Sequence, residues 1–212
     1  PTPTNLPPPP SAPPQSQNQT NTAQAQPDKR TFIARELLST ESTYVDGLEG
    51  LISQFQKPLV DAQCLTPMEQ QILFQNIGPL LKFHMELRKE LTERLEIWDS
   101  NPCLGDLLKK ASPYLKLYTS YVNNFNKVQA VLESIQKNPK VMIPLNACQH
   151  KQMQGHLGLS SLLMTPIQRI PRYVLLLKEM LEKTPQDHPD FEYLSQVNIV
   201  HTVLYSRVNI SV

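Results

Sequence analysis

The run LLMTPIQRIPRYVLLLKEML, from Leu162 to Leu181, is the feature that most constrains the fold of this chain. Its large apolar residues recur at alternating steps of four and three, which places them on one face of a helix at about 100° per residue. The polar residues between them point away from that face, so the outward face is organised as well. The inward stripe is Leu163, Ile167, Ile170, Val174, Leu177 and Leu181, and the outward face is Thr165, Gln168, Arg172, Glu179 and Lys183.

Two prolines, Pro166 and Pro171, lie inside this helical pattern. Proline lacks the backbone N–H and costs about 3 kcal/mol in a regular helix, so prolines are not expected inside a helix that only packs in the core. We expect Pro171 to bend or tighten the helix beside Arg172. This context favours a docking role for Arg172 over a merely solvated charge.

Helical periods continue from residue 30 to the end, and only six glycines occur among the 212 residues. No segment alternates convincingly in the way that strands do. Because several expected helices exceed twenty residues, we predict an all-α fold in the form of an elongated, flattened multi-helix bundle. The expected helices span about 29–56, ending before Pro58; 67–98, interrupted at Gly78-Pro79; a short one after Pro102; 113–137; a weakly patterned one near 144–154; 162–181; and 190–212.

The first 29 residues have a different composition from the rest. Nine of the twenty prolines and five glutamines lie within the first thirty residues, where no apolar period exists. Such a segment buries too little surface to offset its ordering entropy, so we predict a disordered Pro/Gln-rich tail over 1–29 and one folded domain over 30–212, its last helix truncated. The tail contains the spacing PxxP at Pro10–Pro13. This spacing is compatible with a Src-homology-3 partner, and a plain linker is the alternative.

Charge and cysteine content limit the classes of function that this chain can have. Removing Asp28, Lys29 and Arg30 leaves 18 basic and 18 acidic residues in 31–212, so the folded part has no bulk charge that would attract nucleic acid. The three cysteines are odd in number and far apart, which favours reduced thiols in a cytoplasmic protein. No apolar run reaches the length of a membrane-spanning segment.

A charged residue interrupts the inward stripe of the first expected helix. Burying a lone carboxylate costs several kcal/mol, so Glu41 requires a partner. Two alternatives stay open: an ion pair with an arginine of this chain such as Arg169, or a carboxylate held on a rigid helix to accept hydrogen bonds from another protein. The stripe is Ala34, Leu38, Glu41, Val45, Leu48, Ile52 and Phe55.

Motifs for covalent or metal chemistry are missing from the sequence. Gly155 and Gly158 lack the third glycine and the lysine of phosphate-binding loops, and His150 and His156 are poorly spaced for a metal pair on a helix. No serine or cysteine has the sequence context of a nucleophile. We therefore predict no metal, no cofactor and no covalent catalysis.

Three segments together resemble a known family: RELLSTESTYVDGLEGLI (35–52), GDLLKKASPYLKLYTSYVNNF (105–125) and LLMTPIQRIPRYVLLLKEML (162–181). In order and spacing they are similar to the signature regions of the Dbl-homology domain of Rho guanine-nucleotide exchange factors. The resemblance covers about residues 30–212. It implies a protein that binds a Rho- or Rac-family small GTPase and promotes GDP release without covalent chemistry. Recruitment to a membrane would then depend on regions outside this chain.

The resemblance also implies the GTPase-binding residues. Glu41 matches a family glutamate that grips switch I, and Arg172 matches a basic residue that contacts switch II. Asn209 matches an asparagine near the end of the last helix, although Ile210 stands where the family commonly has an acidic residue. Gln168 and Arg169 are expected to support the same surface. The alternative is a helical scaffold that binds a GTPase or other partner without exchange.

Overall fold

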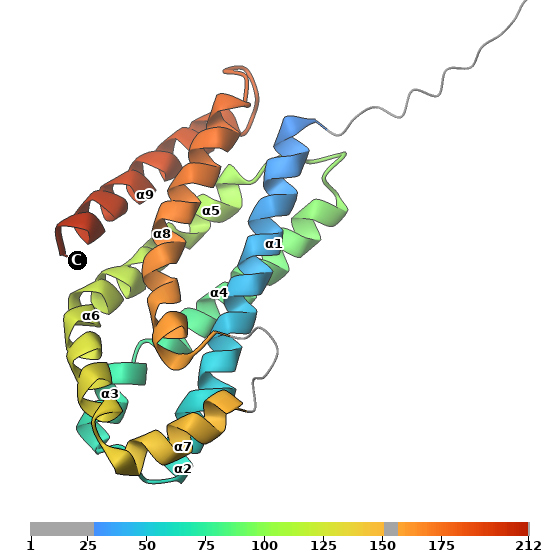
Figure 1. Ribbon diagram of the computed structural model, residues 1–212. Coiled ribbons are helices and arrows are strands. Elements are labelled where there is room, and N and C mark those ends of the chain that lie inside the picture. The colour runs from blue at the N-terminus through green and yellow to red at the C-terminus, as the bar shows by residue number, and fades with distance from the viewer. Residues whose placement is uncertain (1–27, 151–156, 212) are drawn as a thin grey trace, which may run out of the picture.

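The computed structural model describes residues 28–150 and 157–211, and every regular element in these ranges is helical (Figure 1). The all-α prediction is therefore confirmed. The PxxP motif and nearly all of the expected tail lie outside the described residues. The elements are α1 (Lys29–Gly50), the π-helical η1 (Leu51–Gln56), α2 (Lys57–Asp61), α3 (Pro67–Phe74), α4 (Ile77–Glu96), α5 (Gly105–Ala111), the 3-10 turn η2 (Ser112–Tyr114), α6 (Leu115–Gln136), α7 (Pro139–His150), α8 (Leu159–Glu182) and α9 (Phe191–Ser211).

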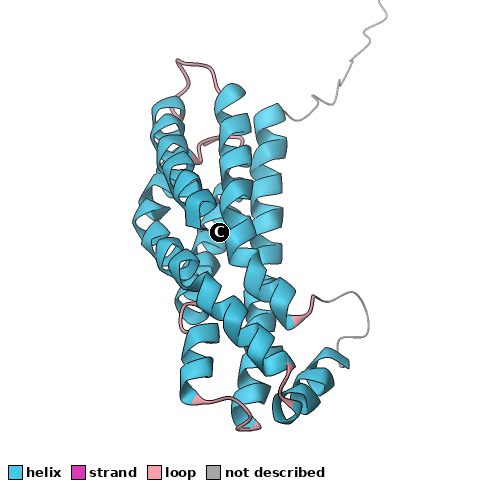
Figure 2. Ribbon diagram, turned by 60° about the vertical axis from the view of Figure 1, so that its left-hand side comes forward, coloured by secondary structure: helices cyan, strands magenta, loops and turns pink. Residues whose placement is uncertain are grey.

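The helices form an elongated bundle, as predicted. Helix α1 packs against α4 and α8, and α8 packs in turn against α9. Figure 2 shows the same bundle from the side, with short loops at both ends of the long helices. Helices α1 and α8, which are about 130 residues apart in sequence, therefore become neighbours whose outward faces adjoin.

Buried apolar side chains form two clusters along the bundle. On α1, Leu37 belongs to one cluster and Tyr44 to the other. On α4, Leu87 belongs to the first and Leu80 to the second. The residues between these pairs include buried polar groups, so a polar layer separates the two halves of the core.

At two prolines the helix boundaries differ from those predicted from the sequence. The first helix does not end before Pro58, because η1 widens the helical turn there and α2 continues the chain to Asp61. A π segment shifts the hydrogen-bond register, and this accommodates the missing proline N–H.

The helix expected near 144 begins at Pro139 instead. Asn138 acts as its cap, because its Oδ1 accepts from Lys140 N at 3.0 Å.

The helix start expected at residue 67 is confirmed, because α3 begins at Pro67 and Thr66 before it forms a complete capping box. The Thr66 hydroxyl accepts from the backbone N–H of Glu69 at 3.2 Å, and the Glu69 carboxylate accepts from the Thr66 N–H at 2.7 Å. Two of the unpaired donors at this helix end are thereby satisfied.

Helix α8 remains helical across both of its prolines. Pro166 cannot donate to the carbonyl of Leu162, and the Thr165 hydroxyl donates to that carbonyl instead, at 2.7 Å. The buried Tyr121 hydroxyl of α6 donates to the next carbonyl, that of Leu163, at 2.5 Å. Side-chain hydroxyls therefore compensate for the disturbed backbone hydrogen bonding, which is how prolines are tolerated inside helices.

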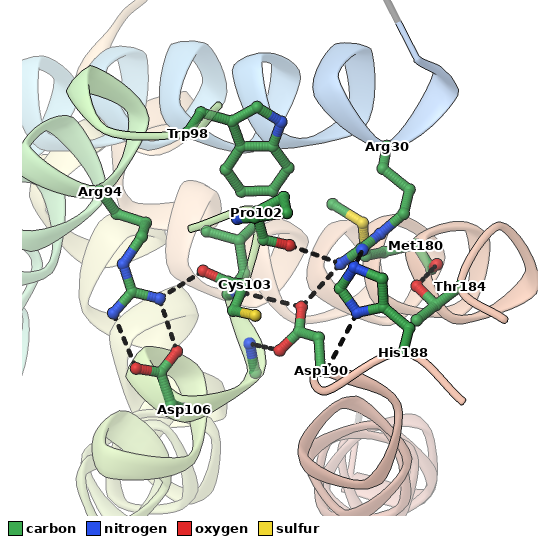
Figure 3. Close-up of polar contacts among 12 residues, drawn as sticks. Arg30, Arg94, Trp98, Pro102, Cys103, Asp106, Met180, Thr184, His188 and Asp190 are labelled. Carbon is green, nitrogen blue, oxygen red and sulfur yellow. Dashed lines mark hydrogen bonds and ion pairs between the residues drawn. The ribbon is translucent and has the colours of Figure 1, made fainter. Parts of the chain in front are cut away.

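A second polar cluster joins the elements at one end of the bundle (Figure 3). The buried Asp190 carboxylate accepts from the backbone N–H groups of Leu104 and Gly105, at 2.9 and 2.7 Å, and from Arg30 Nη2 at 2.8 Å. Arg30 also donates to the carbonyl of Pro102 at 2.9 Å. This cluster ties the start of α1, the start of α5 and the loop before α9 to one another.

Candidate functional site

Glu41 lies at the centre of the buried polar layer, with no exposed surface. Its Oε1 is 2.5 Å from His84 Nδ1, and its Oε2 is 2.5 Å from both Arg169 Nη2 and the Tyr173 hydroxyl. The intramolecular ion pair with Arg169 is therefore the correct one of the two alternatives. This corrects the expectation that Glu41 touches a GTPase directly, because a side chain without exposed surface cannot contact a partner.

The surroundings of Glu41 keep its carboxylate ionised. Burial alone raises the pKa of Glu41, but His84, Arg169 and Tyr173 outweigh that effect through charge and hydrogen bonds, and the pKa lies below its usual value. Burial also raises the pKa of Tyr173 well above its usual value, so its hydroxyl stays protonated and donates to the carboxylate. Glu41 is thus a paired carboxylate whose two oxygens both have hydrogen-bonding partners, and these contacts offset the cost of burying its charge.

Arg169 supports the exposed face from inside instead of forming part of it. It is only 4% exposed, and its guanidinium stacks over the Tyr173 ring at 4.3 Å. A second donor, Nη1, reaches the Thr40 hydroxyl of α1 at 2.9 Å. Arg169 therefore joins α8 to α1 from inside, and its support of a partner-binding face stays a prediction.

The exposed charges above this layer are Glu36 on α1 and Arg172 on α8. Arg172 Nη2 lies 3.8 Å from Glu36 Oε1, and both side chains are more than half exposed. An exposed ion pair of this kind contributes at most about 1 kcal/mol and exchanges its partners readily. Gln168, one turn before Arg172, is also exposed. The outward face predicted for this helix therefore exists and adjoins a carboxylate of α1.

Sequence reasoning missed Glu36 and singled out Glu41 in its place. Both glutamates lie in the segment RELLSTESTYV, five residues apart, which is about 140° on a helix. A stripe that contains Glu41 must therefore leave Glu36 near the opposite, outward face. That angular difference was the signal available in the sequence.

Three comparisons place the chain among known proteins. Residues 33–209 match the family model described as the RhoGEF domain. The chain belongs to the RhoGEF domain family. It is 41% identical over 167 residues to "FYVE, RhoGEF and PH domain-containing protein 3" of Homo sapiens, and the match covers 77% of this chain and 23% of that protein. It is 34% identical over 168 residues to "Guanine exchange factor for Rac 30" of Dictyostelium discoideum, covering 79% of this chain and 10% of that protein.

Solved structures agree with the family and with the fold. The crystal structure of the DH domain of FARP2 superposes with a TM-score of 0.79 at 26% identity, covering 88% of this chain and 91% of that one. Autoinhibited Vav1 superposes with a TM-score of 0.76 at 30% identity, covering 85% of this chain and 34% of that one. The chain covers 91% of the FARP2 DH domain structure, but it spans less than a quarter of the length of the curated relatives named above.

Three further sequence predictions bear on this RhoGEF domain. Asn209 lies within α9, but its side chain is outside the described residues, so its contact with a partner stays a prediction. No group of three or more His, Cys, Asp or Glu side chains able to hold a metal occurs in the part of the chain that the structure describes. No helix there is long and apolar enough to cross a membrane.

Proposed function

We propose that this RhoGEF domain binds a small GTPase of the Rho family through the exposed face of α1 and α8 and thereby promotes the release of GDP. Membership of the family supports the class of activity. The observation that supports this face as the binding surface is the exposed pair of Glu36 and Arg172, held above a buried polar layer. Gln168 flanks this pair, and Asn209 of α9 is the further contact that the family resemblance implies.

The face can bind a partner at little cost. Because the ion pair between Glu36 and Arg172 is exposed, breaking it costs little, and both groups can pair with charges of the GTPase. The helices beneath are already fixed by the buried layer, so little ordering entropy is lost on binding. A preorganised face with one acidic and one basic group selects a partner of complementary charge.

Exchange follows from linkage and needs no covalent step. A factor that prefers the nucleotide-free GTPase weakens nucleotide binding by the same ratio by which nucleotide weakens the binding of the factor. A roughly 10⁵-fold weakening corresponds to about 7 kcal/mol, within reach of an interface of ordinary size, roughly 1,600 Å². Disturbing the switches also disturbs the magnesium that bridges the phosphates of the nucleotide. The domain would act in the cytoplasm, where thiols such as those of Cys64 and Cys103 stay reduced.

Stopped-flow release of fluorescent GDP from a panel of Rho, Rac and related GTPases tests the proposal. We expect acceleration for at least one member and a concentration dependence that saturates. If the folded domain accelerates release from none of them, the proposal is wrong. Stable binding that is indifferent to nucleotide state, without acceleration, would support a scaffold instead.

A further inference from the structure

His84 of α4 lies in the buried polar layer and has no exposed surface. Its Nδ1 is 2.5 Å from Glu41 Oε1, and its Nε2 is 2.8 Å from the Tyr118 hydroxyl of α6. The rings of Tyr44 and Tyr118 meet the imidazole edge-on, with centroids 4.7 and 5.8 Å away. Both ring nitrogens are therefore engaged, two aromatic rings pack against the imidazole, and its orientation is fixed.

The two oxygens of Glu41 divide their partners between helices. Oε1 faces His84 of α4, whereas Oε2 accepts from Arg169 and Tyr173 of α8. Without His84, Oε1 would lie buried with no donor among the contacts described for it, and the carboxylate would be free to rotate toward α8. His84 thus determines how Glu41 presents its second oxygen to Arg169.

The contacts of Arg169 set the register between α1 and α8. Its guanidinium reaches both Glu41 and Thr40 on α1. Arg172 follows Arg169 by three residues, and Glu36 precedes Thr40 by four, so each exposed group stands about one helical turn from the buried contact on its own helix. A slip of one residue moves a helix by 1.5 Å, which is large beside the 3.8 Å between Glu36 and Arg172.

We propose that His84 is a positioning residue for nucleotide exchange: by holding Glu41 it fixes the register of α1 against α8 and hence the spacing of Glu36 and Arg172. This inference rests on the proposed function, and it assigns a role to a helix, α4, that supplies neither of those exposed groups. His84 touches no part of the GTPase. Its effect passes through two buried contacts to the face.

The test compares His84→Leu, His84→Asn and the control Tyr121→Phe. Leucine removes both polar contacts of His84, asparagine can still donate to Glu41, and Tyr121→Phe removes a buried hydroxyl that contacts α8 outside this layer. At an assay temperature well below the melting temperature of the variant, we expect His84→Leu to lower kcat/KM for GDP release at least about 10-fold, mostly through kcat. The reason is that sub-ångström placement of side chains matters at such sites. His84→Asn should recover to within about 3-fold of wild type, and Tyr121→Phe should stay within about 2-fold.

Hydrogen–deuterium exchange gives a readout that needs no GTPase. His84→Leu should lose protection in residues 36–41 and 168–173, and Tyr121→Phe should not. If His84→Leu lowers the melting temperature but leaves both kcat/KM and this protection unchanged, His84 is merely structural and the inference is overturned. If His84→Leu does not fold, Tyr118→Phe replaces it with the same expected loss of protection; this variant removes the Nε2 partner of His84 and also the contact of the Tyr118 hydroxyl with Tyr44. If the wild type accelerates release from no GTPase, the proposed function fails, whereas deprotection in the variant would still show that His84 couples the two helices.

Discussion

Replacing Glu41 by alanine should destabilise the fold strongly, whereas replacing Glu36 should not. Glu41→Ala leaves Arg169 buried, charged and without its carboxylate, and it also removes the acceptor for His84 and Tyr173. Removing one partner of a buried ion pair typically costs about 3–5 kcal/mol. The side chain of Glu36 is 55% exposed, and a surface substitution of this kind stays within about 0.5 kcal/mol.

These free energies convert to a clear difference in melting temperature. For a domain of about 150–250 residues, 1 kcal/mol corresponds to roughly 2–4 °C. Glu41→Ala should therefore melt roughly 6–20 °C below wild type, and Glu36→Ala within about 2 °C of it. The double variant Glu41→Ala/Arg169→Ala should lose less than the sum of the two single losses, because the unpaired guanidinium is gone.

Thermal melting followed by circular dichroism, with urea unfolding as a second measurement, decides between the two roles of Glu41. If Glu41→Ala melts within about 1 °C of wild type while exchange is lost, Glu41 acts at the surface and the buried network is refuted. A large loss of stability without the same loss in Glu36→Ala supports the burial of Glu41.

Three further predictions concern stability. In Gly105→Ala the new Cβ would lie 2.6 Å from Tyr193 Cβ and 2.8 Å from both Asp190 Oδ1 and Leu194 N, so we expect thermal melting to show a loss of about 1–3 kcal/mol in stability. The control Gly78→Ala, whose Cβ would meet nothing within 4 Å, should be neutral or stabilising. Equal melting temperatures for the two variants would contradict this reasoning. Thr66→Ala removes the cap of α3 and should cost about 1 kcal/mol in urea unfolding; an unchanged midpoint would show that the cap contributes nothing. The pKa of Glu41 is lower in the folded than in the unfolded chain, so the stability that its carboxylate gives to the fold is complete above the unfolded pKa of about 4.3 and is lost as pH falls toward the folded value. Below about pH 4.5, wild type should therefore lose more unfolding free energy than Glu41→Gln. Parallel pH profiles for the two proteins would rule this out.

The helical periods of the sequence predicted the fold class and most helix positions, because an amphipathic stripe reports directly which face is buried. All six residues of the predicted α8 stripe are buried or partly buried, and the exposed face carries Gln168 and Arg172 as expected. Exceptions occurred where a proline has two interpretations. The helix expected near residue 144 already begins at Pro139, and the helical chain continues past Pro58 through a π segment. Single-residue signals do not distinguish these outcomes.

The site was harder to predict than the fold, because a stripe does not reveal whether a charge on it is paired. The partners of Glu41 are His84, Arg169 and Tyr173, which are 43 to 132 residues away in sequence. Only tertiary structure brings them together. Glu36 was one outward charge among several on the first helix, and only the tertiary structure shows that α8 places Arg172 beside it.

The measurement that tests the central claim most directly is the rate of GDP release catalysed by Arg172→Ala beside Lys178→Ala. Both residues are exposed on α8, but Lys178 points about 120° away from Arg172. We predict that Arg172→Ala lowers kcat/KM at least about 10-fold with an unchanged melting temperature, while Lys178→Ala stays within about 2-fold of wild type. Equal rates for the two variants would contradict the assignment of the exposed face of α1 and α8 as the exchange surface.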